Sequence, residues 1–135
     1  MGHLFICLLI FLSTFSAFAQ KKSDKGSYEK ALKKIEFENY EGALADLDDA
    51  VKFDSLNSNA YFKRGFVEAM LLKHEEALSD FDRAISLNPG EAQYYSERGV
   101  AKLNLNDREG ACEDWKKAAS MGFAPATELA YEYCP

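Results

Sequence analysis

The fold is decided by the stretch "RGFVEAMLLKHEEALSDFDRAISLNP", residues 64–89. Its apolar residues recur at helical spacing, which is typical of two consecutive amphipathic helices. Pro89 ends the second helix, because a proline ring cannot continue one. Gly65 lies early in the first helix, where a glycine costs about 1 kcal/mol relative to alanine. We expect Gly65 to let the paired helices approach closely; the alternative is a flexible hinge.

The same features return when the chain is shifted by 34 residues. Gly65 returns as Gly99, and Ala31 takes its place in the first unit. A fixed period of this size is the signature of a solenoid. Three further sets coincide: Ala43, Ala77 and Ala111; Ala50, Ala84 and Ala118; and the bulky Leu47, Phe81 and Trp115. The repeated unit is therefore a helix pair with small and bulky residues at fixed positions.

This repeat resembles the tetratricopeptide repeat. Its signature positions are held by Tyr61, Gly65, Ala77, Phe81, Ala84 and Pro89. The resemblance implies an all-α fold, a right-handed α-solenoid of three helix-turn-helix units at 24–57, 58–91 and 92–125. A terminal unit needs a cap, and we expect a capping helix at 124–133. The junction before it is also similar to that of Sel-like repeats.

The N-terminal residues form a separate segment. Leu4 to Phe18 is an uncharged apolar run that ends in Ala17-Phe18-Ala19. This pattern predicts a signal peptide at 1–19, followed by a flexible mature N-terminus at 20–23. The alternative is an uncleaved membrane anchor. We therefore expect an exported protein, either periplasmic or secreted.

Composition argues against several classes of function. The net charge is −6 and no Lys/Arg cluster is present, so a nucleic acid is a poor candidate partner. We expect no stable membrane insertion after the signal is removed. His74 is the one histidine beyond the predicted signal, and its register places it in a turn between helices. The sequence contains no phosphate-binding glycine loop and no Cys-x-x-Cys, so we expect neither an enzyme nor a cofactor or metal site.

Two cysteines lie beyond the predicted signal, Cys112 and Cys134. An even pair in an oxidising compartment indicates a disulfide. If the capping helix folds back antiparallel, the chain before and after Gly122 forms two legs of similar length, and the sulfurs could meet. The alternative is two unpaired thiols, with Cys112 filling a core position.

Charged residues repeat in the same register. We expect them to form a ladder of ion pairs that joins helices within or between units; the alternative is a row of ligand-binding charges. Partly exposed pairs of this kind contribute roughly 0.2–1 kcal/mol each, so they specify register more than stability. The basic members are Lys30, Arg64 and Arg98, and the acidic members are Asp46, Asp80 and Asp114.

The resemblance also implies a binding surface. In tetratricopeptide arrays the first helix of each unit lines a concave groove that receives peptides or partner helices. This implies a non-catalytic scaffold with a protein or peptide partner; the alternatives are ordinary core positions and a homo-oligomer that associates through the groove. The matching groove positions are Tyr28, Leu32, Ile35, Phe62, Phe66, Met70, Ser96, Val100 and Leu103.

Some members of this family grip acidic C-terminal tails with a clamp of Lys, Arg and Asn side chains. Only one of the matching residues here is basic and none is Asn, so we do not expect this mode of binding. The matching residues are Tyr28, Leu32, Lys63, Gln93 and Glu97.

Overall fold

The computed structural model describes residues 26–135. The signal peptide and mature N-terminus predicted for residues 1–23 lie outside this range. Every regular element in the described part is a helix, which confirms the all-α class. Residues 26–36 are helical and are followed by α2 (Tyr40–Phe53), α3 (Ser58–Met70), α4 (His74–Leu87), α5 (Ala92–Asn104), α6 (Arg108–Ser120) and α7 (Ala124–Tyr133).

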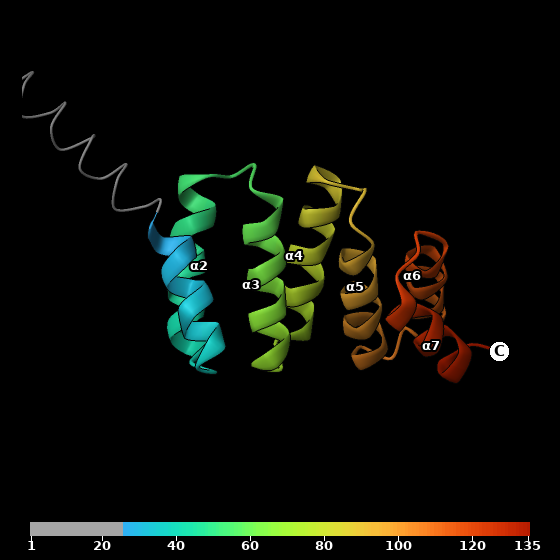
Figure 1. Ribbon diagram of the computed structural model, residues 1–135. Helices are drawn as coiled ribbons and strands as arrows, with labels where there is room; N and C mark the ends of the chain where they lie inside the picture. The colour runs from blue at the N-terminus through green and yellow to red at the C-terminus, as the bar shows by residue number, and fades with distance from the viewer. Residues whose placement is uncertain (1–25) are drawn as a thin grey trace, which may run out of the picture.

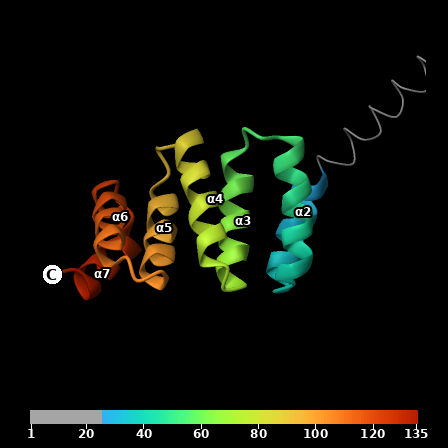
Figure 2. The same ribbon diagram turned by 180° about the vertical axis from the view of Figure 1, so that it is seen from behind.

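The helices stand in a row that runs from the N-terminal to the C-terminal end (Figure 1). Helix α3 packs against α4 and α5 against α6, and the pairs are joined by the contacts of α2 with α3 and of α4 with α5. The tight turns within pairs lie along one edge, at the bottom of Figure 1, and the loops between pairs lie along the other. The view from behind shows the same order (Figure 2). The molecule is therefore an α-solenoid.

The first helix of each pair ends in the same kind of turn. Glu38, Leu72 and Asn106 have positive φ angles of 56°, 61° and 64°. After α3, the amide of Lys73 donates to the carbonyl of Glu68 at 2.8 Å, and the amide of Leu72 donates to that of Ala69. This is the Schellman pattern, in which the left-handed position favours Gly or Asn.

Gly65 contributes to close packing. It is buried inside the unbroken helix α3, and a Cβ atom there would lie 2.9 Å from Cε1 of Phe81. Ala77 and Ala84 are fully buried beside Phe81. The close-packing interpretation of Gly65 is confirmed, and the flexible hinge is not.

Helix α7 covers the end of the array and spans the residues for which a cap is predicted. Gly122, with a φ of 90°, forms the turn that leads into it. Ala126 is fully buried against the cluster around Trp115, and the ring centroid of Tyr133 lies 5.6 Å from that of Trp115. The cap therefore shields the apolar face of α6. Within residues 26–135, every helix is too short or too polar to cross a bilayer.

Candidate functional site

The C-terminal end of the cap is tied to the start of α6. Cys112 on α6 forms a disulfide with Cys134, which follows α7, and their Cα atoms are 5.7 Å apart. Arg108 Nε also donates a hydrogen bond to the carbonyl of Tyr133 at 2.8 Å. The predicted pairing is thus present in the structure, and the alternative of two unpaired thiols is not.

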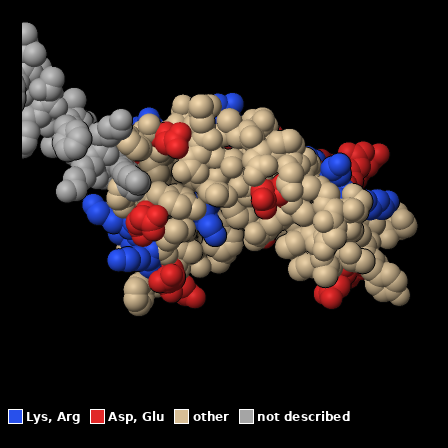
Figure 3. Space-filling model, turned by 45° about the horizontal axis from the view of Figure 1, so that its top comes forward, with Lys and Arg blue, Asp and Glu red and all other residues tan. Residues whose placement is uncertain are grey.

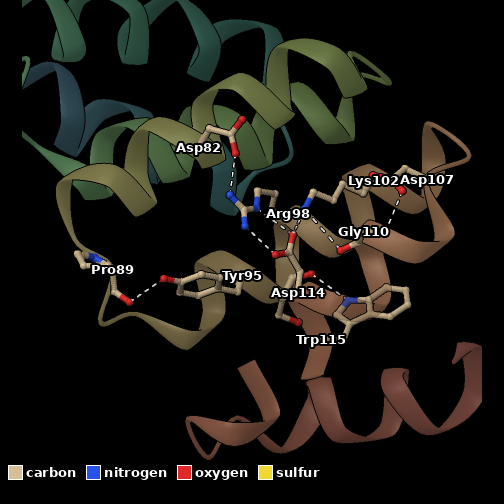
Figure 4. Close-up of polar contacts among 10 residues, drawn as sticks. Asp82, Pro89, Tyr95, Arg98, Lys102, Asp107, Gly110, Asp114 and Trp115 are labelled. Carbon is tan, nitrogen blue, oxygen red and sulfur yellow. Dashed lines mark hydrogen bonds and ion pairs between the residues drawn. The ribbon is translucent and has the colours of Figure 1, made fainter. Parts of the chain in front are cut away.

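Two arginines act as clamps between helices, and Figure 4 shows the one formed by Arg98. Arg98 on α5 donates to both carboxylate oxygens of Asp114 on α6, at 2.8 and 2.7 Å. Its remaining nitrogen, Nη1, donates to Asp82 on α4 at 2.8 Å. Arg64 makes the same contacts with Asp80 and with Asp48 of the preceding pair. Each arginine therefore joins three helices, which supports the structural interpretation of the ladder.

The second carboxylate of each clamp, Asp48 and Asp82, was missing from the sequence interpretation. The signal was available, because these residues are also 34 positions apart.

The first rung of the ladder is different from the prediction. Lys30 is exposed, and Asp46 is bound instead by Nζ of Lys34 at 2.7 Å. The prediction that Lys30 is a member of the ladder is therefore wrong. Lys34 reaches Asp46 from one helical turn further along, and Lys102 does the same to Asp114 at 2.9 Å.

The middle pair carries a glutamate at the position of these two lysines. Glu68 is buried on α3, and its Oε2 atom has no hydrogen-bond partner among the described residues. Burial, followed by the neighbouring Asp80 carboxylate, raises the pKa of Glu68 to about 8. Asp80 is therefore paired with Arg64 but with no lysine, and the raised pKa of Glu68 favours the protonated form of its carboxyl group.

Two of the predicted groove positions are closed in the structure. The ring of Phe62 stacks on Tyr94 of the next pair, with centroids 4.7 Å apart, and only 4% of Phe62 is exposed. Tyr94 is held there because its hydroxyl donates to Asn59 Oδ1 at 2.6 Å. Ser96 is also buried, and its carbonyl accepts a hydrogen bond from Trp115 Nε1. The prediction that Phe62 and Ser96 line the groove is therefore wrong.

The remaining groove positions keep part of their surface. Met70 is 47% exposed, and six others are half-buried: Tyr28, Leu32, Ile35, Phe66, Val100 and Leu103. They lie on helix 26–36, α3 and α5, the first helices of successive pairs. The face seen in Figure 3 is largely uncharged over the middle of the array, and charged groups gather near its ends.

Lys63 and Glu97, both at positions of the acid-binding clamp, lie close enough for the charge of the lysine to act on the carboxyl group. Burial raises the pKa of Glu97, and the positive charge of Lys63 acts in the opposite direction. The one basic residue of the clamp set is therefore close to a carboxylate of this chain, which opposes binding of an acidic tail.

A hollow of about 920 Å³ lies beside the disulfide, between the start of α6 and the end of α7. Its lining contains charges of both signs: Arg108, Lys116, Glu109, Glu113 and Glu132. No group of three or more metal-ligating side chains comes together anywhere in residues 26–135.

Neither a protein-family model nor a curated protein matches this sequence. Solved structures do match its fold. The first TPR domain of Spaghetti (RPAP3) bound to the HSP90 peptide SRMEEVD has a TM-score of 0.77 and 24% identity, covering 84% of this chain and 91% of that one. The Arabidopsis OM64 TPR domain has a TM-score of 0.79 and 18% identity, covering 85% and 97%.

The TPR2B domain of yeast Sti1, in complex with pHsp70, matches with a TM-score of 0.77 and 16% identity, covering 82% of this chain and 94% of that one. At these identities the likeness concerns the fold alone. The chain therefore has the helical solenoid fold seen in tetratricopeptide repeat domains.

Proposed function

We propose that this protein is a non-catalytic scaffold that binds a peptide or a helical segment of a partner along the first helices of its pairs. The observation that carries the proposal is the set of half-buried apolar side chains on helix 26–36, α3 and α5, joined by the exposed Met70. Two solved structures of similar fold are complexes with an HSP90 peptide and with pHsp70, which supports a role in protein binding.

The chemistry of the face favours an apolar ligand over an acidic tail. Phe66, Val100 and Leu103 offer aliphatic and aromatic surface. Burying such surface contributes roughly 25 cal/mol per Å². The residues of the acid-binding clamp are absent, and its one matching basic residue, Lys63, lies near the carboxyl group of Glu97. An amphipathic helix that lays its apolar side on this face fits these properties.

We also propose that the protein works outside the reducing cytoplasm. The apolar segment at residues 4–18 supports export. The Cys112–Cys134 bond agrees with it, because structural disulfides persist in oxidising compartments.

The test compares partner capture by the wild type and three variants of the full chain. Phe66→Asp and Met70→Glu place charge on the proposed face, and Leu56→Asp places it on the exposed edge between α2 and α3. We expect the first two variants to lose partners that the wild type and Leu56→Asp retain, with circular dichroism unchanged. Partners retained by all forms would contradict the proposal.

Two further outcomes would also count against it. Unfolding of both face variants would show that Phe66 and Met70 are core residues. A stable wild-type dimer in light scattering that Met70→Glu converts to a monomer would assign the face to self-association.

A further inference from the structure

The edge formed by the turns within pairs has surface properties that the proposed binding face does not explain. This edge is at the bottom of Figure 1. Phe37 and Leu72 belong to its first two turns and are 83% and 78% exposed. They are more exposed than any large hydrophobic residue assigned to the binding face. We call this surface the turn edge; it comprises residues 36–41, 71–76 and 104–109.

The middle turn departs from local folding preferences at consecutive positions. Leu72 occupies the left-handed position of the Schellman turn, where the equivalent turn after α5 has the favoured Asn106. Lys73 then precedes α4 without capping it, whereas Asn39 and Asp107 cap α2 and α6 with their side chains. The sequence thus places a strained, exposed leucine where a polar residue would stabilise the turn. Departures of this kind are expected at functional sites.

The same turn borders a small recess. A hollow of about 230 Å³ lies between Leu72 and Leu105 of the next turn, with Lys73, His74, Glu75 and Glu76 around it. The Nδ1 atom of His74 is buried there without a hydrogen-bond partner among the described residues. An aliphatic side chain of a partner would contact Leu72 and Leu105 in this recess.

The charge around these leucines is predominantly negative. Lys73 and Arg108 are the cations of the turn edge, and Arg108 is bonded to the carbonyl of Tyr133. Carboxylates at the start of a helix also favour helix formation, so charge alone identifies no partner. Six exposed glutamates lie on the edge: Glu36, Glu38, Glu41, Glu75, Glu76 and Glu109.

We propose that the turn edge docks a positively charged segment of another protein, anchored by an apolar side chain at Leu72 and Leu105. Apolar anchors provide affinity at such a surface, and the surrounding carboxylates select a basic partner and increase its rate of association. This surface shares no residue with the face assigned to the scaffold function, although Met70 of that face directly precedes it in the chain.

The test uses a labelled amphipathic peptide of leucine and lysine, about five helical turns long. Its fluorescence anisotropy is measured against the full chain and compared with a peptide in which glutamate replaces lysine. We expect the lysine peptide to bind and the glutamate peptide to bind at least about tenfold more weakly. Leu72→Asn combined with Phe37→Gln should weaken the lysine peptide about tenfold.

Leu56→Asn is the matched control, because Leu56 is 72% exposed on the opposite edge; it should leave affinity unchanged. Phe66→Asp separates this proposal from the scaffold function, because an amphipathic peptide also fits the face that contains Phe66. Affinity lost in Phe66→Asp and retained in the Leu72→Asn, Phe37→Gln double variant would assign the peptide to that face and overturn the proposal. Equal binding of both peptides, or equal losses in the Leu72 and Leu56 variants, would overturn the proposal. A wild-type dimer that Leu72→Asn converts to a monomer would overturn the proposal, because the turn edge would then bind a second copy of this chain.

Discussion

A Cβ atom at Gly99 would lie 2.6 Å from Nε1 of Trp115, closer than side-chain atoms can approach. The same relationship joins Gly65 to Phe81, at 2.9 Å. In the first pair, where the bulky position is Leu47, an alanine replaces the glycine, and Ala31 and Leu47 are both fully buried in one cluster. The absence of a side chain on the first helix thus accompanies an aromatic ring on the second.

We predict that Gly65→Ala destabilises the fold by about 1–3 kcal/mol, because the added methyl overpacks against Phe81. This outweighs the gain of about 1 kcal/mol that alanine normally brings to a helix. Adding Phe81→Leu to Gly65→Ala should recover part of the loss, because the pair then matches Ala31 and Leu47. Urea unfolding of both single variants and the double variant measures the coupling.

Gly26→Ala is the control, because nothing lies within 4 Å of a Cβ at that position. It should be neutral or stabilising. Additive effects at positions 65 and 81 would contradict the proposed packing relationship.

The repeat, the helix pairs and the cap could be predicted from the sequence because their determinants are local or periodic. The burial of Phe62 could not. Phe62 lies one helical turn before Gly65, and both residues are next to Phe81. Helical spacing does not show that Tyr94 of the next pair stacks on the ring of Phe62. Contacts between pairs depend on how far successive pairs rotate, which the period alone does not specify.

The first rung of the ladder was misassigned for a different reason. Alignment of the units placed Lys30 with Arg64 and Arg98. At this position of the second unit, however, Arg64 bonds to carboxylates on two other helices, Asp80 on α4 and Asp48 on α2. The actual partner of Asp46, Lys34, aligns with Glu68, whose opposite charge concealed the repeated lysine position. Periodicity identified Asp46, Asp80 and Asp114 correctly. It failed at the lysine position, where the middle pair has Glu68 instead.

The strain at Leu72 gives a second prediction. Leu72→Asn should raise stability by about 1 kcal/mol, because a leucine pays a steric cost in the left-handed region that asparagine largely avoids. For a domain of this size the melting temperature should rise by roughly 4–8 °C. Asn106→Leu, in the equivalent turn, should produce a loss of similar size. A loss of stability in Leu72→Asn would show that Leu72 contributes more by packing than it costs in strain.

The disulfide gives a third prediction. Cys134→Ser should lower the free energy of unfolding by roughly 3 kcal/mol, as expected for a bond that closes a loop of this length. Because Trp115 is the one tryptophan and lies 5.6 Å from Tyr133, loosening of α7 should change its fluorescence. A reductant should have the same effect on the wild type and none on Cys134→Ser. Two thiols that react with an alkylating agent in unreduced exported protein would contradict the pairing.

The buried Glu68 makes stability depend on pH in a defined direction. Its pKa is about 8 in the folded protein, against a usual value of 4.5. Between these two values the folded state binds a proton that the unfolded state has released. Stability contributed by this group is therefore complete below about pH 4.5 and is lost progressively as the pH rises through about 8.

The final prediction is that Glu68→Lys stabilises the fold by about 1–3 kcal/mol at pH 8, because it removes a buried carboxylate and gives Asp80 the partner that Asp46 and Asp114 already have. The difference from the wild type should shrink toward pH 5, where Glu68 is protonated. Glu68→Gln should show the same trend with a smaller gain, and the exposed Glu36→Gln should show no trend. Urea midpoints measured between about pH 5 and pH 8 provide the comparison. A difference between Glu68→Gln and the wild type that stays constant over this range would mean that Glu68 is ionised throughout, and that the folded protein solvates its charge.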